Sequence, residues 1–345
     1  MLVYPLPDPA GEAVLATGTQ IVRLADDREA TILAAIADAD AIVLRGPAQL
    51  SATMIEGAPR LRVIGALGSG TDNIDVAAAT RRGIPVVHGA GLAPRAVSEW
   101  VVGAMVACHR GFNRLDRAVR AGIDDWSVRP ARYRATELTG TVVGIVGYGF
   151  IGRSVARVVQ AAFDADVVVY DPLLTATDPT PTNHEVFGLV GAITPTNPKT
   201  YPVVGGVRRV DRLEELLDAS MTVTVHVPLL PSTKGLFGED ELRRIGPGGV
   251  LLNASRGGVV DEAALVAVLC EGALKAAAVD VFADEPPTAE QVARLASAPN
   301  LLLSPHVAGI TDQALSALSI GVAEGVLAVL RGARPDRLVN PEVLP

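Results

Sequence analysis

The chain has 345 residues, of which 49% are hydrophobic and 20% charged. This length exceeds that of one ordinary core and fits two domains, and the apolar content excludes general disorder. The net charge of −8 comes from dispersed residues with no acidic or basic run, which argues against a nucleic-acid partner.

The N-terminal part alternates short apolar runs with helical patterns. We expect strands at 20–24, 41–45, 61–65 and 84–88, and helices at 28–38, 48–56 and 75–82. Such alternation predicts a parallel sheet covered by helices, the α/β class. A long apolar-periodic stretch at 95–110 follows Pro94 and predicts a buried helix.

A second alternating series starts at Thr141. Its Val- and Leu-rich runs fit parallel strands buried on both faces, at 141–146, 166–170, 221–226, 249–253, 276–281 and 301–304. A last helix is expected at about 311–331. Segment 173–209 is rich in Thr, Pro and Gly and shows no clear strand or helix, so it is interpreted as an insertion or a lid.

The sequence shows few features that would indicate a cellular compartment. Cys108 and Cys270 each lie in an apolar, helix-like stretch, which predicts two buried free thiols and no metal ligand. The N-terminus lacks a basic start followed by an apolar run, so no secretory signal is visible. Charges, Pro or Gly interrupt each apolar stretch before membrane-spanning length. We therefore expect a cytoplasmic protein with no membrane partner.

A glycine-rich turn, Gly147, Gly149 and Gly152 in the pattern GxGxxG, lies between a predicted strand and a predicted helix. The motif alone is weak evidence, because a Gly-rich turn occurs in parallel-sheet proteins without a nucleotide. With its strand and helix it predicts a dinucleotide site. The first Gly permits the turn, the second admits a pyrophosphate, and the third lets helix and strand pack closely.

Asp171 ends the next predicted strand, where an acid accepts hydrogen bonds from the adenosine ribose hydroxyls. It would also repel a 2′-phosphate, and the residues after it offer no Arg to bind one. The sequence therefore predicts NAD rather than NADP as the cofactor.

Three polar side chains, Arg256, Glu285 and His306, follow predicted strands. Each alone has a plain explanation: a surface ion pair, a turn residue and a loop histidine. Together they form a chemically complete set. A guanidinium binds a carboxylate bidentately, an imidazole exchanges protons near neutral pH, and a carboxylate favours the protonated imidazole.

The chain resembles the D-isomer-specific 2-hydroxyacid dehydrogenases over essentially its full length. The matching stretches occur in the family's order: GALGSGTDNID (65–75), AVSEW (96–100), GIVGYGFIGRSVA (144–156), HVPLLPSTKGLFG (226–238), LLNASRGGVVDE (251–262), AVDVFADEPP (278–287), SPHVAG (304–309) and VNPEVL (339–344).

The resemblance implies that Arg256, Glu285 and His306 form the catalytic set. It places cofactor contacts at Ser69, Gly147, Gly149, Phe150, Ile151, Gly152, Asp171, His226, Val227, Pro228, Thr233, Ala254, Ser255, Arg256, Asp280, His306 and Gly309. It places substrate contacts at Arg45, Leu67, Gly68, Ser69, Gly70, Arg256 and His306, where Arg45 matches a position that meets the substrate phosphate in 3-phosphoglycerate dehydrogenases.

The implied fold has two doubly wound domains with a cleft between them. A flavodoxin-like substrate domain would comprise 1–99 and 318–345, and a Rossmann NAD domain 100–317. Helix 95–110 would lie in a homodimer interface. Segment 173–209 is longer than the family's usual connection. The sequence ends soon after 339–344, so we expect no C-terminal regulatory domain and no serine-type feedback inhibition.

The implied reaction is hydride transfer between NAD and C2 of a small D-2-hydroxy acid of the 3-phosphoglycerate, hydroxypyruvate or glyoxylate type. Formate dehydrogenases share the fold but place Gln where this chain has Glu285. Phosphite dehydrogenase-like chemistry fits the same three residues and stays an alternative. An NAD-sensing corepressor also shares the fold, although the basic or disordered extension that would favour it is not found.

Overall fold

The computed structural model describes residues 2–3, 6–26, 28–46, 48–122, 126–128, 133–174, 203–204 and 207–344. The chain forms two compact units, Met1–Pro94 with Gly309–Pro345, and Arg95–Ala308. The boundaries between these units, after Pro94 and after Ala308, differ from the domain boundaries expected after residues 99 and 317. Helix α5 (Pro94–Arg110) contributes to the core of the second unit and helix α13 (Asp312–Leu330) to that of the first, so each boundary lies at a helix's beginning.

The first unit contains a five-stranded sheet in the order β2-β1-β3-β4-β5, and its pairs are parallel. This is the flavodoxin-like order. The strands are β1 (Leu2–Val3), β2 (Val22–Arg23), β3 (Ala41–Leu44), β4 (Val63–Ala66) and β5 (Val86–His88). The other elements are α1 (Pro9–Ala16), α2 (Glu29–Ile36), α3 (Ala52–Glu56), α4 (Val76–Arg81) and the 3₁₀ turn η2 (Pro341–Val343).

Two elements near the N-terminus, β1 and α1, were not predicted. Helix α1 starts at Pro9 after Asp8, whose carboxylate accepts the Ala10 amide, and it packs along α13. Proline suits the first helical position, because its missing N–H has no partner there in any case. Strand β1 is two residues long and owes its place to pairing with β2 and β3.

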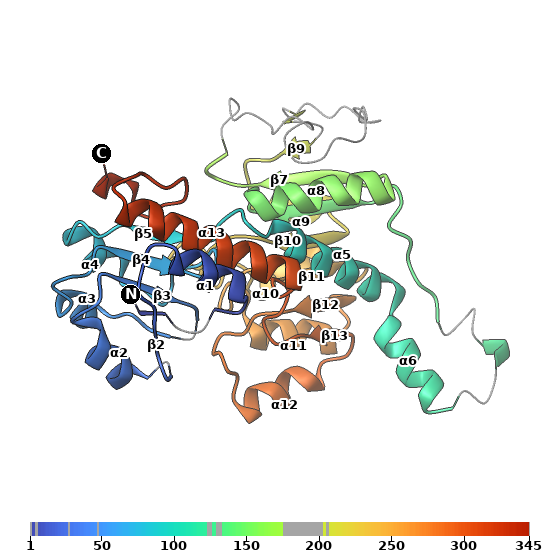
Figure 1. The fold of residues 1–345 in the computed structure, drawn as a ribbon. Coiled ribbons are helices and arrows are strands. Elements are labelled where there is room, and N and C mark those ends of the chain that lie inside the picture. Colours follow the sequence, from blue (N-terminus) through green and yellow to red (C-terminus); the bar gives the residue numbers. More distant parts are fainter. Residues whose placement is uncertain are drawn as a thin grey trace. The chain divides into compact units, whose positions relative to one another are not determined.

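Helix α13 corrects one expectation, because its 19 residues are long and apolar enough to cross a membrane by length and composition. We expected charges or Gly to interrupt each such stretch, but Gly321, Glu324 and Gly325 all lie within this one helix. Its apolar side packs on α1, β4 and β5 in the core of the first unit. It is therefore interpreted as a core helix (Figure 1).

The second unit contains an eight-stranded sheet in the order β13-β12-β11-β10-β6-β7-β9-β8. The strands are β6 (Val142–Val146), β7 (Asp166–Tyr170), β8 (Val203–Val204), β9 (Val207–Arg209), β10 (Thr222–Val225), β11 (Val250–Asn253), β12 (Ala276–Val279) and β13 (Leu301–Leu303). Only the β8–β9 pair is antiparallel among those that the structure describes. The order reverses between β6 and β10, the switch point at which open α/β sheets bind ligands.

Strands β8 and β9 overturn part of one prediction, since no strand was expected in 173–209. Strand β9 pairs with β7. It was not predicted because two of its three residues, Arg208 and Arg209, are charged, so it does not form an apolar run. The rest of that segment, 175–202 and 205–206, lies outside the described residues.

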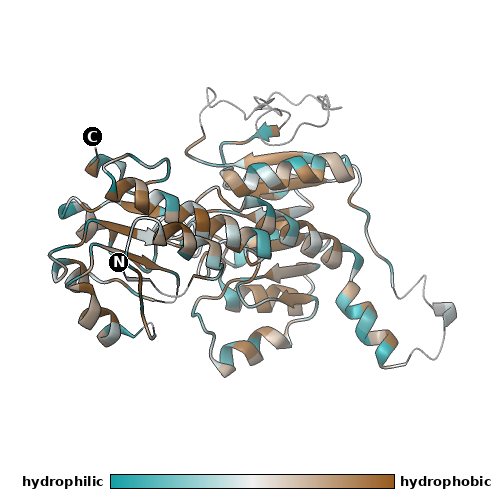
Figure 2. Ribbon diagram, in the orientation of Figure 1, coloured by the Kyte–Doolittle hydropathy of each residue, from teal (hydrophilic) through white to brown (hydrophobic). Residues whose placement is uncertain are grey.

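Helices cover both faces of the second sheet, whose strands are strongly apolar (Figure 2). They are α5, α8 (Phe150–Phe163), α9 (Leu213–Ala219), α10 (Glu239–Ile245), α11 (Glu262–Cys270) and α12 (Ala289–Ser297). Helix α6 (Phe112–Arg120), which has no buried residue, and the 3₁₀ turn η1 (Trp126–Val128) come between α5 and β6 in the chain. Cys108 is buried on α5, as predicted, and burial raises the pKa of its thiol to about 12. Cys270 is exposed, because it is the last residue of α11, so that prediction was wrong.

Candidate active site

The glycine turn between β6 and α8 has two positions that only glycine fits. Gly147 has φ +92°, and a Cβ there would lie 2.7 Å from the carbonyl oxygen of His226. A Cβ on Gly152 would lie 2.3 Å from the carbonyl oxygen of Gly147. The turn and the close packing of helix on strand therefore require these two glycines.

Gly149 differs from its two neighbours, because a Cβ there would meet no heavy atom within 4 Å. Packing within the protein does not require glycine at this position. The residue caps α8, a helix of 14 residues, with no side-chain hydrogen bond. First-turn amides without such a cap are suited to phosphate oxygens, and a bare Cα lets a pyrophosphate approach.

Asp171 follows β7, and its carboxylate contacts the glycine turn. One oxygen accepts the Tyr148 amide at 2.8 Å and the other accepts the Leu173 amide at 2.9 Å. Each carboxylate oxygen has a further lone pair, so the acid is held in place and still able to accept a hydroxyl. Arg153 supports the same turn by donating to the Tyr148 carbonyl at 3.0 Å and lying over the Tyr148 ring, an arrangement that the sequence did not reveal.

The loop that carries Arg256 is shaped by Asn253, the buried last residue of β11. The Asn253 side-chain oxygen accepts the amide and hydroxyl of Ser255, and its NH₂ group donates to the Arg256 carbonyl at 3.1 Å. A Cβ on Gly257 would lie 1.6 Å from the carbonyl oxygen of Phe282. The Arg256 loop therefore packs directly on the loop after β12.

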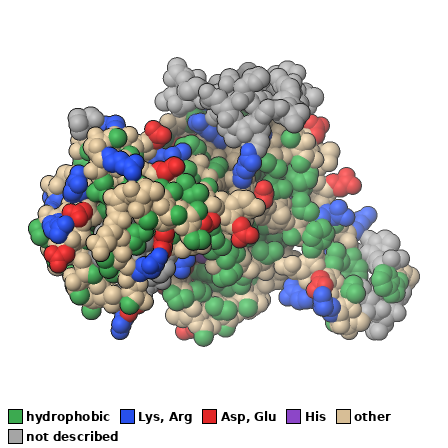
Figure 3. Space-filling view, in the orientation of Figure 1, with side chains coloured by type: hydrophobic (Ala, Val, Ile, Leu, Met, Phe, Trp, Pro, Cys, Tyr) green, Lys and Arg blue, Asp and Glu red, His purple; other side chains and the backbone are tan. Residues whose placement is uncertain are grey.

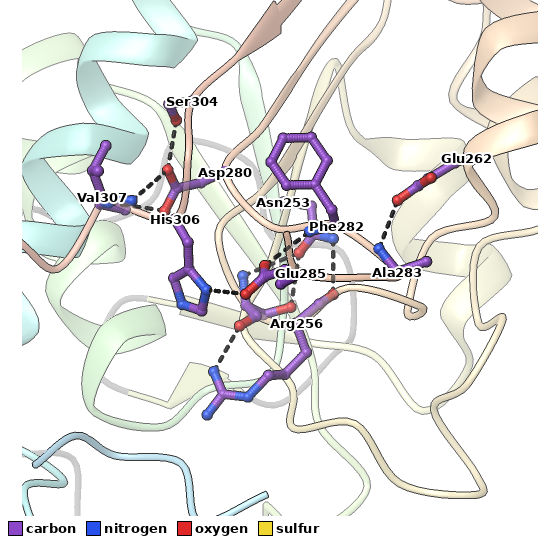
Figure 4. Close-up of polar contacts among 12 residues, drawn as sticks. Asn253, Arg256, Glu262, Asp280, Phe282, Ala283, Glu285, Ser304, His306 and Val307 are labelled. Carbon is purple, nitrogen blue, oxygen red and sulfur yellow. Dashed lines mark hydrogen bonds and ion pairs between the residues drawn. The ribbon is translucent and has the colours of Figure 1, made fainter. Parts of the chain in front are cut away.

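Asp280 lies buried just after β12 and positions the segment around His306 (Figure 4). One carboxylate oxygen accepts the Ser304 hydroxyl at 2.5 Å and the Val307 amide at 2.9 Å, and the other accepts the Ala308 amide at 2.8 Å. The Asp280 carbonyl accepts the His306 amide at 2.7 Å. Both carboxylate oxygens of Asp280, a predicted cofactor contact, thus accept hydrogen bonds from the protein itself.

Glu285 and His306 form a direct pair. Glu285 Oε2 lies 2.6 Å from His306 Nδ1, and Oε1 accepts the Phe282 amide at 3.0 Å. Their side chains are 36% and 50% exposed, so the pair is open on one side. His306 has φ +53°, a conformation that costs free energy in a non-glycine residue and is concentrated at functional sites. Because Nδ1 faces the carboxylate, Nε2 is the atom available for proton exchange.

His226, a predicted cofactor contact, is unsuited to acid–base work. Burial lowers the pKa of its imidazole to about 3, so the ring is neutral at physiological pH. Its Nε2 lies 3.0 Å from the Thr224 hydroxyl, and Nδ1 is buried without a hydrogen bond to the described residues. Close to it, Thr233 closes the turn after β10 by accepting the Leu230 amide and donating to the Pro228 carbonyl.

In the first unit, the predicted substrate residues follow two neighbouring strands, β3 and β4. Arg45 is exposed just after β3, and the segment 67–70 follows β4, with Gly68 at φ +151°. His88, which ends the adjacent β5 and was not predicted, hydrogen-bonds the Ser69 carbonyl through Nδ1 at 3.3 Å. Burial lowers the pKa of His88, so at neutral pH the ring donates to Ser69 in its uncharged form.

Residues 102–193 and 187–308 match the family model described as the D-isomer specific 2-hydroxyacid dehydrogenase NAD binding domain. The chain is also 34% identical to a glyoxylate reductase of Thermofilum pendens, over 91% of this chain and 85% of the relative. The chain belongs to the D-isomer specific 2-hydroxyacid dehydrogenase family. The matched residues fall in the unit Arg95–Ala308, which is this family's NAD-binding domain.

Other known proteins are similar over nearly the whole chain. A D-3-phosphoglycerate dehydrogenase of Methanocaldococcus jannaschii is 32% identical over 98% of this chain, which spans only 57% of that relative's length. A crystal structure of a Thermus thermophilus protein matches with a TM-score of 0.79 and 28% identity, covering 98% of this chain and all of the other. An NADPH-dependent glyoxylate/hydroxypyruvate reductase of Sinorhizobium meliloti matches with a TM-score of 0.78 and 28% identity, over 99% and 97% of the two chains.

The remaining family positions lie around these loops. Phe150 and Ile151 begin α8, where Phe150 is 66% exposed and Ile151 is half-buried. Val227 and Pro228 follow β10, Ala254 and Ser255 follow β11, and Gly309 follows the His306 segment. No group of three His, Cys, Asp or Glu side chains within the described part of the chain is placed to bind a metal ion.

Proposed function

We propose that the chain is an NAD-dependent dehydrogenase that transfers a hydride between the nicotinamide and C2 of a small D-2-hydroxy acid or its 2-oxo counterpart. The observation that carries this proposal is the 2.6 Å Glu285–His306 pair, in which the Glu285 loop packs against the Arg256 loop. Family membership and relatives named as dehydrogenases and reductases of such acids support it.

His306 is the proton-transferring residue. In reduction, Nε2 gives a proton to the substrate oxygen as C2 gains the hydride that bound NADH supplies, leaving the hydroxy acid and NAD⁺. In oxidation, the same nitrogen removes the hydroxyl proton. The Glu285 carboxylate at Nδ1 keeps the ring in one orientation, with its negative charge beside the positive charge that the ring carries when it is ready to donate.

Arg256 is the residue that binds the substrate carboxylate. Its backbone is fixed by Asn253, and its Nη1 donates to the Ser255 carbonyl at 2.7 Å (Figure 4). A guanidinium held this way offers two parallel N–H groups to a carboxylate. The substrate-binding roles of Arg45, Leu67, Gly68, Ser69 and Gly70 stay predictions of this proposal.

NAD is the proposed cofactor, on the strength of Asp171. Its fixed carboxylate suits the two ribose hydroxyls and opposes a 2′-phosphate. The structurally similar reductase from S. meliloti uses NADPH, so the choice is specific to each member and must be measured.

The proposed form is a cytoplasmic homodimer with no nucleic-acid or membrane partner. No residue of helix α6 is buried, and its apolar Phe112 and Val119 are 50% and 57% exposed. Leu115 lies on the same face of the helix, because it is three residues after Phe112 and four before Val119. A second copy of the chain would cover this apolar stripe. Charges of both signs are mixed on the face drawn in Figure 3, which offers no extended basic surface to a nucleic acid. A monomer in sedimentation equilibrium would contradict the dimer.

The reaction is tested with the purified protein, NADH or NADPH, and a set of 2-oxo acids that includes hydroxypyruvate, glyoxylate and the phosphorylated three-carbon acid. We expect oxidation of NADH with at least one of these acids. If none is reduced, and no matching hydroxy acid is oxidised, the enzyme proposal fails.

A further inference from the structure

Residues 281–288, in the loop between β12 and α12, include Glu285 and are mostly exposed. An exposed loop does not hold a carboxylate at 2.6 Å from its partner unless something fixes the backbone. One anchor is Gly257, whose Cα touches the Phe282 carbonyl. A second is Gln291, whose side chain donates to the Asp284 carboxylate from the first turn of α12.

The third anchor is Glu262, the first residue of α11, which is distant in sequence from this loop. Its Oε1 accepts the Ala283 amide at 2.7 Å, and its side chain is only 12% exposed (Figure 4). Its other oxygen lies 3.8 Å from Nη2 of Arg294 on α12. A carboxylate this buried requires partners, and the partners it has are the Glu285 loop and the helix that follows that loop.

The connection from Glu262 to the reacting pair is short. Glu262 accepts its hydrogen bond from the Ala283 amide. The preceding amide, that of Phe282, donates a hydrogen bond to Glu285 Oε1. Consecutive amides of one loop thus bind two carboxylates, one fixed on a helix and one at the reacting histidine. Displacement at Ala283 moves the Phe282 amide and with it the Glu285 side chain.

We propose that Glu262 is a positioning residue, which sets the Glu285–His306 distance by anchoring the Ala283 amide. This inference rests on the proposed dehydrogenase function and adds a residue to it. Glu262 does not touch the substrate. It acts through the loop, so its loss should change proton transfer at His306 and leave binding of the 2-oxo acid nearly unchanged.

The test uses Glu262→Ala and Glu262→Gln, with Glu290→Ala as a control, an exposed acid in the same region. Glu262→Ala should lower kcat for reduction about tenfold, because small misplacements of reacting groups are costly, with KM changed less than about twofold. The upper pH limit of kcat/KM should move to lower pH. Glu262→Gln keeps the accepting oxygen and should restore both, and Glu290→Ala should match wild type.

A readout independent of turnover is hydrogen exchange of the amides in 281–288. Glu262→Ala should speed exchange at Ala283, and Glu262→Gln should restore protection. Inactive wild-type protein would defeat the proposed function, while hydrogen exchange would still test the anchor. If the wild type is active and Glu262→Ala keeps its kcat and pH profile, the positioning role is overturned. Should Glu262→Ala not fold, Glu262→Asp, too short to reach Ala283, takes its place with the same expected changes.

A double-variant cycle distinguishes action through Glu285 from general damage. If Glu262 acts through this carboxylate, adding Glu262→Ala to Glu285→Gln should not move the upper pH limit further. A further shift of the same size in the double variant would show that Glu262 acts by another route and would overturn the proposal.

Discussion

Nδ1 of His306 lies 2.6 Å from Oε2 of Glu285. The two residues come from different loops, one after β12 and one after β13, and Asp280 fixes the second loop through the amides of Val307 and Ala308. Their contact commits Nδ1 to the carboxylate and leaves Nε2 for the substrate.

Glu285→Gln should slow reduction more than oxidation. The variant removes the negative charge beside the imidazole ring and keeps an oxygen that accepts the hydrogen bond from Nδ1. We expect kcat for reduction to fall about tenfold or more, since general acid catalysis contributes about 100- to 10,000-fold in total. The upper pH limit of kcat/KM for reduction should move to lower pH. Unchanged pH profiles in both directions would mean that the pair does not govern proton transfer.

Two glycine substitutions in the nucleotide turn should behave differently. Gly149→Ala places its Cβ in open space and should leave the melting temperature within about 1 °C of wild type, yet weaken NADH binding. Gly152→Ala forces its Cβ against the Gly147 carbonyl and should lower both the melting temperature and NADH affinity. Thermal melts and NADH fluorescence titration measure the two effects. Normal NADH affinity in Gly149→Ala would show that no pyrophosphate approaches this residue.

Asp171→Asn should shift cofactor use toward NADPH. The amide oxygen still accepts the Tyr148 N–H, while the negative charge and the hydrogen bond from the Leu173 N–H are lost. Like-charge contacts cost several kcal/mol, so the ratio of kcat/KM for NADPH over NADH should rise about tenfold or more. A ratio equal to that of wild type would assign the preference to another residue.

Stability should decline in mild acid because of His109. This ring is 1% exposed on α5, its Nε2 lies 2.7 Å from the Thr222 hydroxyl, and burial, helped by the charge of Lys275, lowers its pKa to about 4. A buried histidine whose pKa is lower in the folded than in the unfolded state makes the free energy of unfolding depend on pH. Its contribution to stability is complete above the unfolded pKa of 6.5 and is lost as the pH falls toward the folded pKa of about 4. Each pKa unit corresponds to about 1.4 kcal/mol, so the loss approaches about 3 kcal/mol.

Urea unfolding at several pH values between neutrality and mild acid measures this effect. His109→Gln has no group that titrates in this range, and its free energy of unfolding should vary less with pH than that of wild type. The buried His226 contributes in the same direction and remains in the variant. If the wild type is as stable in mild acid as at neutral pH, His109 is not buried in its neutral form.

Much of the second unit could be predicted from the sequence, because its strands are apolar runs and its functional side chains follow them directly. The turn at Gly147 and the residues Arg256 and His306 are of this kind. The first strand and helix could not be predicted, since β1 is two residues long and depends on partners distant in sequence. Strand β9 was hidden by its two arginines.

The supporting contacts of the site are the part that sequence reasoning missed. Asn253 and Glu262 act through hydrogen bonds to backbone amides and carbonyls whose positions depend on the folded loops. Side-chain type alone does not reveal from which amide a carboxylate accepts a hydrogen bond. The prediction that Cys270 is buried was wrong for a similar reason, because an apolar helix pattern does not tell which terminal residue faces solvent.

The central claim, that His306 transfers the proton, is tested most directly by His306→Ala in NADH-dependent reduction of the best 2-oxo acid found for the wild type. The variant should bind NADH with nearly wild-type affinity, and its kcat should be about 100- to 10,000-fold lower. A kcat within about twofold of wild type would contradict the account.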